Sequence, residues 1–307
     1  MNKKNARAVV RRQPSVMGRG TASNFTNAAI VAGNSGQERQ LSDDAIWQLY
    51  QTRKQSVGDI AKHYGVSPST IKRRLSNIKI RWSQPQISGG GYVHLDTTYW
   101  GHNWGVLLAL DNATRKPLYL EFINHETIDD YLEALDSIKK REFEIRGIII
   151  DGKKGLFNRL PDRRLQMCQY HMKEIVKRYL TKNPKLLAAR ELLSLVNMLT
   201  CTGEEEFKER FSQWRQRWNE VLSKRSTSSR TGKSRYTHRR LRTAMNSLNF
   251  FLPYLFTFQH DECTGMPNTN NLIEGVFSDL KKNLNCHCGM NENSRKRFIA
   301  GFFKALG

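Results

Sequence analysis

The sequence predicts an α/β fold built around a mixed β-sheet, and three observations lead to this prediction. Two short apolar runs, residues 92–96 and 147–151, each end in an aspartate. Two more apolar runs, residues 104–110 and 117–122, are separated by a turn, and a stretch with helical spacing of apolar residues follows at 127–142. Short apolar runs are typical of strands buried in a sheet, so we expect a β-meander, a crossover helix and a parallel strand.

The composition indicates a nucleic-acid partner. The chain has 307 residues, enough for more than one domain, and its 50 Lys and Arg against 28 Asp and Glu give a net charge of +22. An excess of this size favours a polyanionic partner, most often nucleic acid. An anionic membrane surface is the alternative. No apolar run approaches the roughly 18–20 residues of a spanning helix, so we expect no membrane partner.

The cysteines and the first residues bear on the compartment. Five is an odd number of cysteines, and their uneven spacing favours a reducing compartment over a secreted disulfide framework. Residues 1–40 show no period and few large apolar side chains, so we predict a basic, disordered arm. Residues 1–37 also lack acids, which loosely mimics an organellar transit peptide, but the arm is the favoured interpretation. The cysteines are Cys168, Cys201, Cys263, Cys286 and Cys288.

Residues 41–82 have the pattern of a helix-turn-helix DNA-binding domain. Ser42 can cap a first helix, a second helix at residues 57–64 ends at Gly65, and a third helix covers residues 69–78. Glycine permits the turn, and the basic third helix would face the major groove and its flanking phosphates. The alternative is an ordinary three-helix unit with a solvated basic face. The candidate DNA contacts are Ser67, Ser69, Thr70, Lys72, Arg73 and Arg74.

A linker is expected at residues 83–91, which contain Pro85 and three consecutive glycines. The meander, the helix and the parallel strand then make the opening of an RNase H-like fold, whose first part covers residues 92–182. In that fold the first and fourth strands are neighbours, so Asp96 and Asp151 would meet at one sheet edge. Two like charges so close are costly unless a divalent cation lies between them, which predicts a metal–carboxylate site.

The core continues through a fifth strand at residues 164–168 and a helix at 171–180, before an all-helical insertion at 183–266. An aromatic stripe recurs there at helical spacing, and we interpret its two tryptophans as core residues rather than base-stacking ones. Residues 224–242 carry eight Lys or Arg and no acid, so we predict a mobile loop that becomes ordered on phosphate. The stripe consists of Phe207, Phe211, Trp214, Trp218 and Val221.

The last part of the core, residues 267–307, supplies a third acid. Residues 268–282 have the pattern of a helix with one apolar face, and Glu274 lies beside that face, where it can look into the sheet edge. Lys281 and Lys282 are placed on the same helix to hold a DNA backbone. The predicted architecture is therefore an RNase H-like core with a mixed five-stranded sheet, interrupted by a helical insertion and preceded by a helix-turn-helix.

The three acids belong to an ordered set of short motifs. These are Leu95-Asp96, Ile150-Asp151-Gly152, Cys168-Gln169-Tyr170-His171, Asn270-Asn271-Leu272-Ile273-Glu274, Phe277-x-x-Leu280-Lys281 and His287-x-Gly289. Together they resemble the DDE transposases of prokaryotic insertion sequences related to Mutator elements, over residues 90–303. The long gap between Asp151 and Glu274 suits the helical insertion that such transposases carry. Relatives often begin with a cysteine-rich zinc ribbon, whereas no cysteine precedes Cys168 here.

The resemblance implies a function and a set of partners. Asp96, Asp151 and Glu274 would be the catalytic residues and would bind two Mg²⁺ ions, with Mn²⁺ as a substitute. The implied enzyme is a DDE-type DNA transposase, which cleaves DNA strands at insertion-sequence ends and transfers them. Its partners would be double-stranded DNA (terminal inverted repeats and target DNA) and further copies of itself, as a dimer or higher oligomer. Its location would be the prokaryotic cytoplasm, at the nucleoid when it binds DNA.

Two questions stay open at this point. Cys168 and His171 either form a packing and hydrogen-bonding pair, which is favoured, or help to hold a structural zinc ion. The further zinc ligands would come from Cys286, His287 or Cys288.

The chain could also be a related RNase H-like nuclease or resolvase that hydrolyses DNA without joining it, or a domesticated transposase kept as a helix-turn-helix regulator. Loss of an acid would favour the regulator, and all three acids are present.

Overall fold

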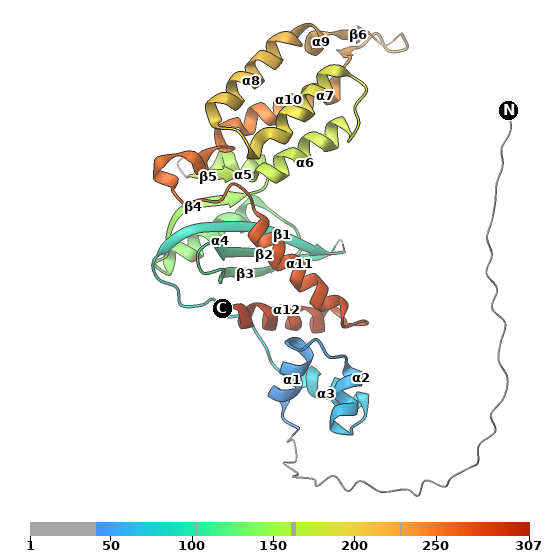
Figure 1. Ribbon diagram of the computed structural model, residues 1–307. Coiled ribbons are helices and arrows are strands. Elements are labelled where there is room, and N and C mark those ends of the chain that lie inside the picture. Colours follow the sequence, from blue (N-terminus) through green and yellow to red (C-terminus); the bar gives the residue numbers. More distant parts are fainter. Residues whose placement is uncertain (1–40, 102, 161–163, 228) are drawn as a thin grey trace, which may run out of the picture. The chain divides into compact units, whose positions relative to one another are not determined.

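The computed structural model describes residues 41–101, 103–160, 164–227 and 229–307. The arm predicted for residues 1–40 lies outside them. A five-stranded sheet has the order β3-β2-β1-β4-β5, in which β1, β2 and β3 form an antiparallel meander and β4 and β5 run parallel to β1 (Figure 1). This is the mixed sheet of an RNase H-like core, so the predicted fold class is confirmed. The strands are β1 (Gly90–Trp100), β2 (Trp104–Asp111), β3 (Pro117–Ile123), β4 (Glu144–Ile150) and β5 (Leu165–Met167).

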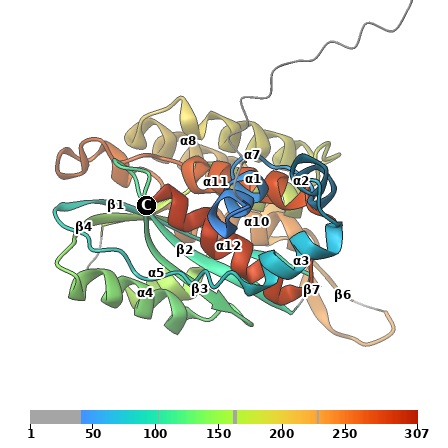
Figure 2. The ribbon, with the colours of Figure 1, turned by 90° about the horizontal axis from the view of Figure 1, so that it is seen from below.

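Helices cover both faces of the sheet, and the alternation of side chains along each strand decides which layer a residue joins. Leu95 of β1 points into the core that contains α4 (Ile128–Lys140). Leu108 of β2 points the other way, into the core that contains α11 (Asn271–Asn285) and α12 (Glu292–Leu306). Figures 1 and 2 show α4 and the α11–α12 pair on opposite sides of the strands. The sheet is therefore a buried middle layer.

The first strand is longer than the sequence indicated. We expected a linker over residues 83–91 and a strand that ends at Asp96, but β1 begins at Gly90 and continues to Trp100. The reason is that β2 pairs with β1 to its last residue, whereas β4 pairs with it only as far as His94. Pairing with β2 keeps the backbone extended beyond the acid. Asp96 therefore lies inside a strand, just beyond the part that β4 covers.

Three helices form at the positions predicted within residues 41–82. Ser42, Ser56 and Ser67 each precede one of them, and each side-chain oxygen accepts a backbone N–H three residues further on. Gly65 ends the second helix at φ 64°, a left-handed conformation that glycine adopts without strain. The helices are α1 (Asp43–Gln51), α2 (Val57–Tyr64) and α3 (Pro68–Asn77).

A bundle of helices lies beyond β5, at the edge of the sheet opposite β3 (Figure 1). Trp214 is 5% exposed, and its Nε1 donates a hydrogen bond to the carbonyl oxygen of Ala188 (3.0 Å). Trp218 is half-buried, and its Nε1 donates to Oε2 of Glu191 (2.8 Å). Both tryptophans therefore belong to the helical core, as predicted. The helices of this region are α5 (Lys154–Arg159), α6 (Gln169–Leu180), α7 (Leu187–Asn197), α8 (Glu204–Arg217), α9 (Asn219–Ser223) and α10 (Arg239–Phe251), with short 3₁₀ helices η1 (Met198–Thr200), η2 (Leu252–Tyr254), η3 (Thr257–Gln259) and η4 (Asp261–Cys263).

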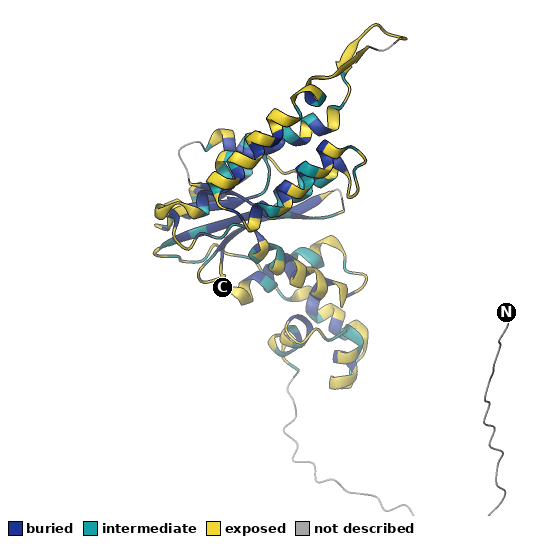
Figure 3. Ribbon diagram, turned by 45° about the horizontal axis from the view of Figure 1, so that its top comes forward, coloured by how far each residue is buried: buried dark blue, intermediate teal, exposed yellow. Residues whose placement is uncertain are grey.

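The stretch predicted to be a mobile loop, residues 224–242, contains regular structure instead. Strands β6 (Arg225–Thr227) and β7 (Ser234–Tyr236) pair as a hairpin, and α10 begins at Arg239. The guanidinium carbons of Arg225 and Arg242 lie 4.5 and 3.6 Å from the centroid of the Tyr236 ring. Two cation–π contacts therefore hold like charges together at the base of the hairpin, which a count of charges could not reveal. Figure 3 shows the hairpin as exposed.

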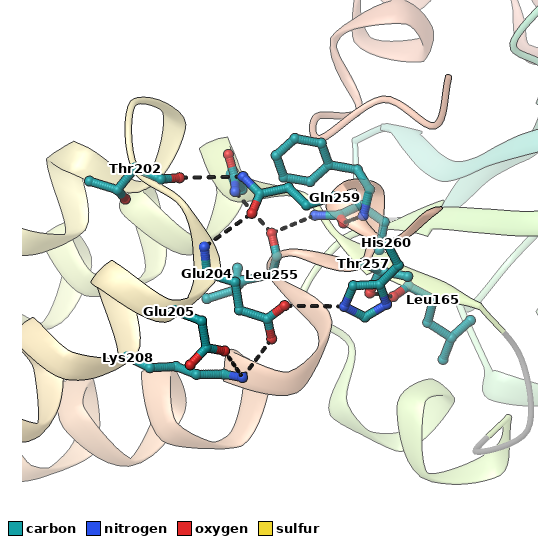
Figure 4. A network of polar contacts seen from close by, with 12 residues as sticks. Leu165, Thr202, Glu204, Glu205, Lys208, Leu255, Thr257, Gln259 and His260 are labelled. Carbon is teal, nitrogen blue, oxygen red and sulfur yellow. Dashed lines mark hydrogen bonds and ion pairs between the residues drawn. The ribbon is translucent and has the colours of Figure 1, made fainter. Parts of the chain in front are cut away.

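A polar network attaches the start of α8 to the segment that returns from the bundle to the sheet (Figure 4). Oε1 of Glu204 lies 2.8 Å from Nζ of Lys208, and Oε2 of Glu204 lies 3.1 Å from Nε2 of His260. The side chain of Gln259 accepts the backbone N–H of Glu204 (3.0 Å). Thr257 donates its hydroxyl to the carbonyl oxygen of Leu165 (2.6 Å), so the network reaches the first residue of β5.

Candidate active site

Strand register brings the two aspartates to neighbouring positions. The last residue pair between β1 and β4 is His94 with Ile149, and Asp96 and Asp151 each lie two residues beyond it. Side chains two residues apart on a strand point to the same face, so both aspartates point to the side of His94. That side is the one on which α11 packs, because Leu108, the partner of Asp96 on β2, belongs to the α11 core.

The third acid reaches the same place from the first turn of α11. Nδ1 of His171, on the first turn of α6, lies 2.8 Å from Oδ1 of Asp151 and 3.5 Å from Oε1 of Glu274. One imidazole nitrogen therefore contacts both carboxylates, although neither contact has the angles of a good hydrogen bond. Asp151 and Glu274 thus lie beside the same imidazole, and the charges of both act on Asp96 of β1.

Burial and mutual repulsion perturb the acids. Burial, followed by the charge of Asp151, raises the pKa of Asp96 to about 8, against a hydrogen bond from the backbone N–H of Thr97 (2.8 Å) that lowers it. Burial also raises the pKa of Glu274, with a smaller contribution from Asp151. Burial lowers the pKa of His171, but the neighbouring Asp151 and the sulfur of Cys168 outweigh this effect and raise it to about 11. Such a cluster favours a positive charge among the carboxylates.

Cys168 immediately precedes α6 and lies next to Asn270 at the start of α11. It is buried, and its sulfur accepts the backbone N–H of Asn270 (3.2 Å). Asp151, Cys168 and His171 each offer one ligand atom, and these atoms lie within 4.8 Å of one another. Within the described ranges of the chain, this is the one group of three such residues close enough to hold a metal ion. A mixed sulfur, nitrogen and oxygen set suits zinc better than magnesium.

The further zinc ligands considered for Cys168 and His171 lie elsewhere. The ring of His287 is 4.0 Å from that of Tyr50 and 5.2 Å from that of Phe298, measured between centroids, in the core shared by α1 and α12. Neither His287 nor its two cysteine neighbours joins the Cys168 group. The zinc site that would combine these two motifs does not form.

The carboxylates themselves fit a hard divalent cation. Oε1 of Glu274 is buried and accepts no hydrogen bond from any described residue. Asp96 and Asp151 add further carboxylate oxygens beside it, and oxygen is the donor that Mg²⁺ and Mn²⁺ prefer. The three acids offer the donor type that Mg²⁺ and Mn²⁺ prefer, whereas Asp151, Cys168 and His171 are the three described residues whose ligand atoms already lie within 4.8 Å of one another.

The candidate DNA contacts in and before α3 differ in whether their side chains are already bound to other parts of the chain. Ser67 caps the helix, since its Oγ accepts the N–H of Thr70 (3.1 Å). Arg74 donates to the carbonyl oxygen of Leu41, and its Nε lies 3.5 Å from Oδ1 of Asp43, so it attaches α3 to the start of α1. Four candidates are exposed, and three of them, Ser69, Lys72 and Arg73, are not used as the helix cap. On α11, Lys281 and Lys282 are also exposed, and Lys282 pairs with Asp279 (3.4 Å).

Sequence reasoning assigned no role to two buried polar residues in the site. Asn270, at the start of α11, contacts Asp151, and His94 on β1 contacts Asn270. Both are fully buried. The sequence did contain one indication of this pair: His94 lies inside an apolar strand run, and a buried polar side chain needs a hydrogen-bond partner.

A second polar chain, also without an assigned role, supports Asp96 from the α4 side. The hydroxyl of Thr97 lies 3.0 Å from that of Tyr131, which donates to Oε1 of Glu126 (2.7 Å). Nζ of Lys153, two residues after Asp151, lies 2.8 Å from the same Glu126 oxygen. No motif in the sequence marks these residues.

Comparisons with known proteins add little. No family model and no curated protein matches the chain. Among solved structures, the Drosophila P element transposase strand transfer complex is similar with 12% identity and a TM-score of 0.35, over 89% of this chain and 88% of that chain. The simian T-cell lymphotropic virus intasome in complex with PP2A regulatory subunit B56 gamma is similar with 10% identity and a TM-score of 0.23, over 64% and 74%. Scores this low do not indicate what the chain does. In the part of the chain that the structure describes, no helix has the length and apolar character of a membrane span.

Proposed function

We propose that the chain is a DDE-type transposase, an enzyme that cleaves DNA strands at the ends of a mobile element and joins them to target DNA. The observation that carries this proposal is the meeting of three carboxylates from β1, the end of β4 and the start of α11 on an RNase H-like sheet. The order of the acids and the motifs around them support the narrower assignment to relatives of Mutator-like insertion sequences.

Asp96, Asp151 and Glu274 are the proposed ligands of two divalent cations, Mg²⁺ or Mn²⁺. When bound, such ions supply charge stabilisation at the phosphate and make water or a DNA 3′-hydroxyl a better nucleophile. The chain's own part is to hold the carboxylates in place. The contacts of His171 with Asp151 and Glu274 keep these two acids together before any cation arrives. The carboxylates then act as ligands, so neither a covalent nucleophile nor a histidine base is required.

The proposed substrate is double-stranded DNA, both terminal inverted repeats and target. The charge of +22 and the exposed Ser69, Lys72 and Arg73 on α3 support binding through residues 41–82, with α3 in the major groove. The exposed Lys281 and Lys282, on the helix that carries Glu274, are suited to hold the backbone beside the acids. We assign residues 92–182 and 267–307 to the catalytic core and 183–266 to an insertion.

The test is cleavage of DNA that flanks the gene, in the presence of Mg²⁺, with mapping of the 3′ ends. Asp96→Asn, Asp151→Asn and Glu274→Gln are each expected to lower cleavage and joining by at least about 10³-fold, with little change in DNA binding, because the acids hold the cations. Asp279→Asn is the matched control on α11, since Asp279 is exposed and pairs only with Lys282 among the described ion pairs. Full activity in any of the three variants removes that residue from the site. Cleavage without joining would identify a nuclease or resolvase, and sequence-specific binding without cleavage would identify a regulator.

A further inference from the structure

Asn270 is a buried junction between the segments that carry the three acids. Its side chain is fully buried, and its Oδ1 lies 2.8 Å from Nδ1 of His94. Its Nδ2 donates to the carbonyl oxygen of Leu95 (3.1 Å) and approaches Oδ1 of Asp151 (3.4 Å). Its backbone N–H donates to the sulfur of Cys168 (3.2 Å). One residue therefore contacts β1, the end of β4 and the start of α6.

The partners of Asn270 fix the direction of each hydrogen bond. The Leu95 carbonyl and the Asp151 carboxylate are acceptors, so the amide nitrogen of Asn270 must face them and its oxygen must face His94. Nδ1 of His94 must then carry a hydrogen, and it donates a hydrogen bond to Oδ1 of Asn270. The side chain of Asn112 lies 3.1 Å from Nε2 and holds the other end of the ring. Whether or not Nε2 carries a proton, Nδ1 remains the donor.

The same residue sets the position of the third acid. Asn270 immediately precedes α11, and its carbonyl oxygen accepts the backbone N–H of Glu274 (3.2 Å), which closes the first turn. A shift of Asn270 would therefore move Glu274 and would also change the contact of the Asn270 side chain with Asp151. Buried amides with all partners satisfied are rigid, because an unpaired polar group costs about 1–3 kcal/mol.

We propose that His94 and Asn270 are positioning residues that hold Asp96, Asp151 and Glu274 at the spacing needed to bind divalent cations. The inference rests on the proposed function, since it assumes that the acids bind such ions. His94 is suited to this role because it lies two residues before Asp96 on the same face of β1 and reaches Asn270 across the sheet edge. Partners of this kind, which orient ligands without touching the metal, typically change metal affinity by about 10–100-fold when they are removed.

The test measures Mn²⁺ affinity directly, by the electron paramagnetic resonance of free Mn²⁺, on the full chain without DNA. Asn270→Ala and His94→Leu are each expected to weaken Mn²⁺ binding by about 10–100-fold. His94→Asn places an amide N–H near the position of Nδ1 and is expected to recover most of the affinity. Asn268→Ala is the matched control, because Asn268 lies in the same segment and donates to Gln169 but contacts none of the acids. Circular dichroism and the thermal unfolding midpoint check that each variant is folded.

The outcomes separate the inference from the proposed function. Wild-type affinity for Mn²⁺ in both Asn270→Ala and His94→Leu would overturn the positioning role and leave the transposase proposal standing. Absence of Mn²⁺ binding by the wild type would overturn both. An equal loss in Asn268→Ala would show a general loosening of the segment and overturn the specific role of Asn270. If Asn270→Ala does not fold, Asn270→Ser replaces it, because serine fills part of the space and still hydrogen-bonds.

Discussion

The raised pKa of Asp96 predicts that the site destabilises the metal-free protein. Between the ordinary value of 3.8 and the raised value of about 8, the unfolded chain releases the Asp96 proton while the folded chain retains it. The free energy of unfolding therefore falls as pH rises through this window, and Asp96→Asn abolishes that part of the fall. Each pKa unit corresponds to about 1.36 kcal/mol, so the cost at pH 7 is on the order of 4 kcal/mol. Because solvent reaches part of the Asp96 side chain, we expect Asp96→Asn to raise the free energy of unfolding by about 2–4 kcal/mol at pH 7.

The assay is urea unfolding of wild type and Asp96→Asn, followed by circular dichroism, with a chelator at about pH 5 and about pH 7.5. The variant's gain in free energy of unfolding should be larger at the higher pH, because the folded wild type retains the Asp96 proton that the unfolded chain has released. Added Mg²⁺ should stabilise the wild type, in which the acids can bind it, more than the variant. Asp279→Asn should change the free energy of unfolding by less than about 0.5 kcal/mol at either pH, since its carboxylate is exposed. A variant no more stable than wild type at either pH would refute the electrostatic account of the site.

Three further predictions concern residues away from the acids. Arg73→Ala should weaken DNA binding and flatten the dependence of log affinity on log salt by about 0.9 if the contact is to phosphate, and an unchanged slope would show that another face touches DNA. Arg74→Ala should instead lower the thermal midpoint, because this side chain holds α3 to Leu41; an unchanged midpoint with weaker binding would contradict the assignment. Tyr236→Leu should loosen the β6–β7 hairpin by removing two cation–π contacts, and limited trypsin digestion should then cut residues 224–242 faster than in the wild type, whereas an unchanged cleavage rate would contradict this account.

The sheet could be predicted from the sequence because its signals are local. Apolar runs bounded by turn residues mark β2 and β3, and the helical stripe marks α4 with Thr127 as its cap. The end of β1 could not be predicted, because it depends on how far β2 and β4 each pair with it. Helices α5 and α12 were not expected either. α12 packs through Phe298, Ile299 and Phe303, which acquire a partner only when the rest of the fold is present.

The site shows the same division between local and long-range information. Asp96 and Asp151 could be selected because each ends an apolar run in the sequence, and Glu274 because it lies in the first turn of a helical pattern. The contact of His94 with Asn270 could not, because 176 positions separate the two residues and either could have been a surface polar group. The roles of Arg73 and Arg74 were also indistinguishable in the sequence, since only the fold shows that Leu41 and Asp43 occupy the second. Composition could count the charges of residues 224–242 but could not show that Tyr236 lies between two of them.

The last prediction concerns assembly and follows from the geometry of the proposed reaction. A mobile element has two ends and one RNase H-like site handles one strand at a time, so coherent joining of both ends needs at least two copies of the site. The eight cations of residues 224–242 repel one another until phosphates neutralise them, which favours assembly on DNA rather than before it. Wild type mixed with an equal amount of Asp151→Asn should therefore join both ends at about one quarter of the wild-type level, as random pairing in a symmetric dimer requires, rather than at about one half. A loss in strict proportion to dilution, together with a monomeric mass of the active DNA complex by light scattering, would contradict the need for a second copy.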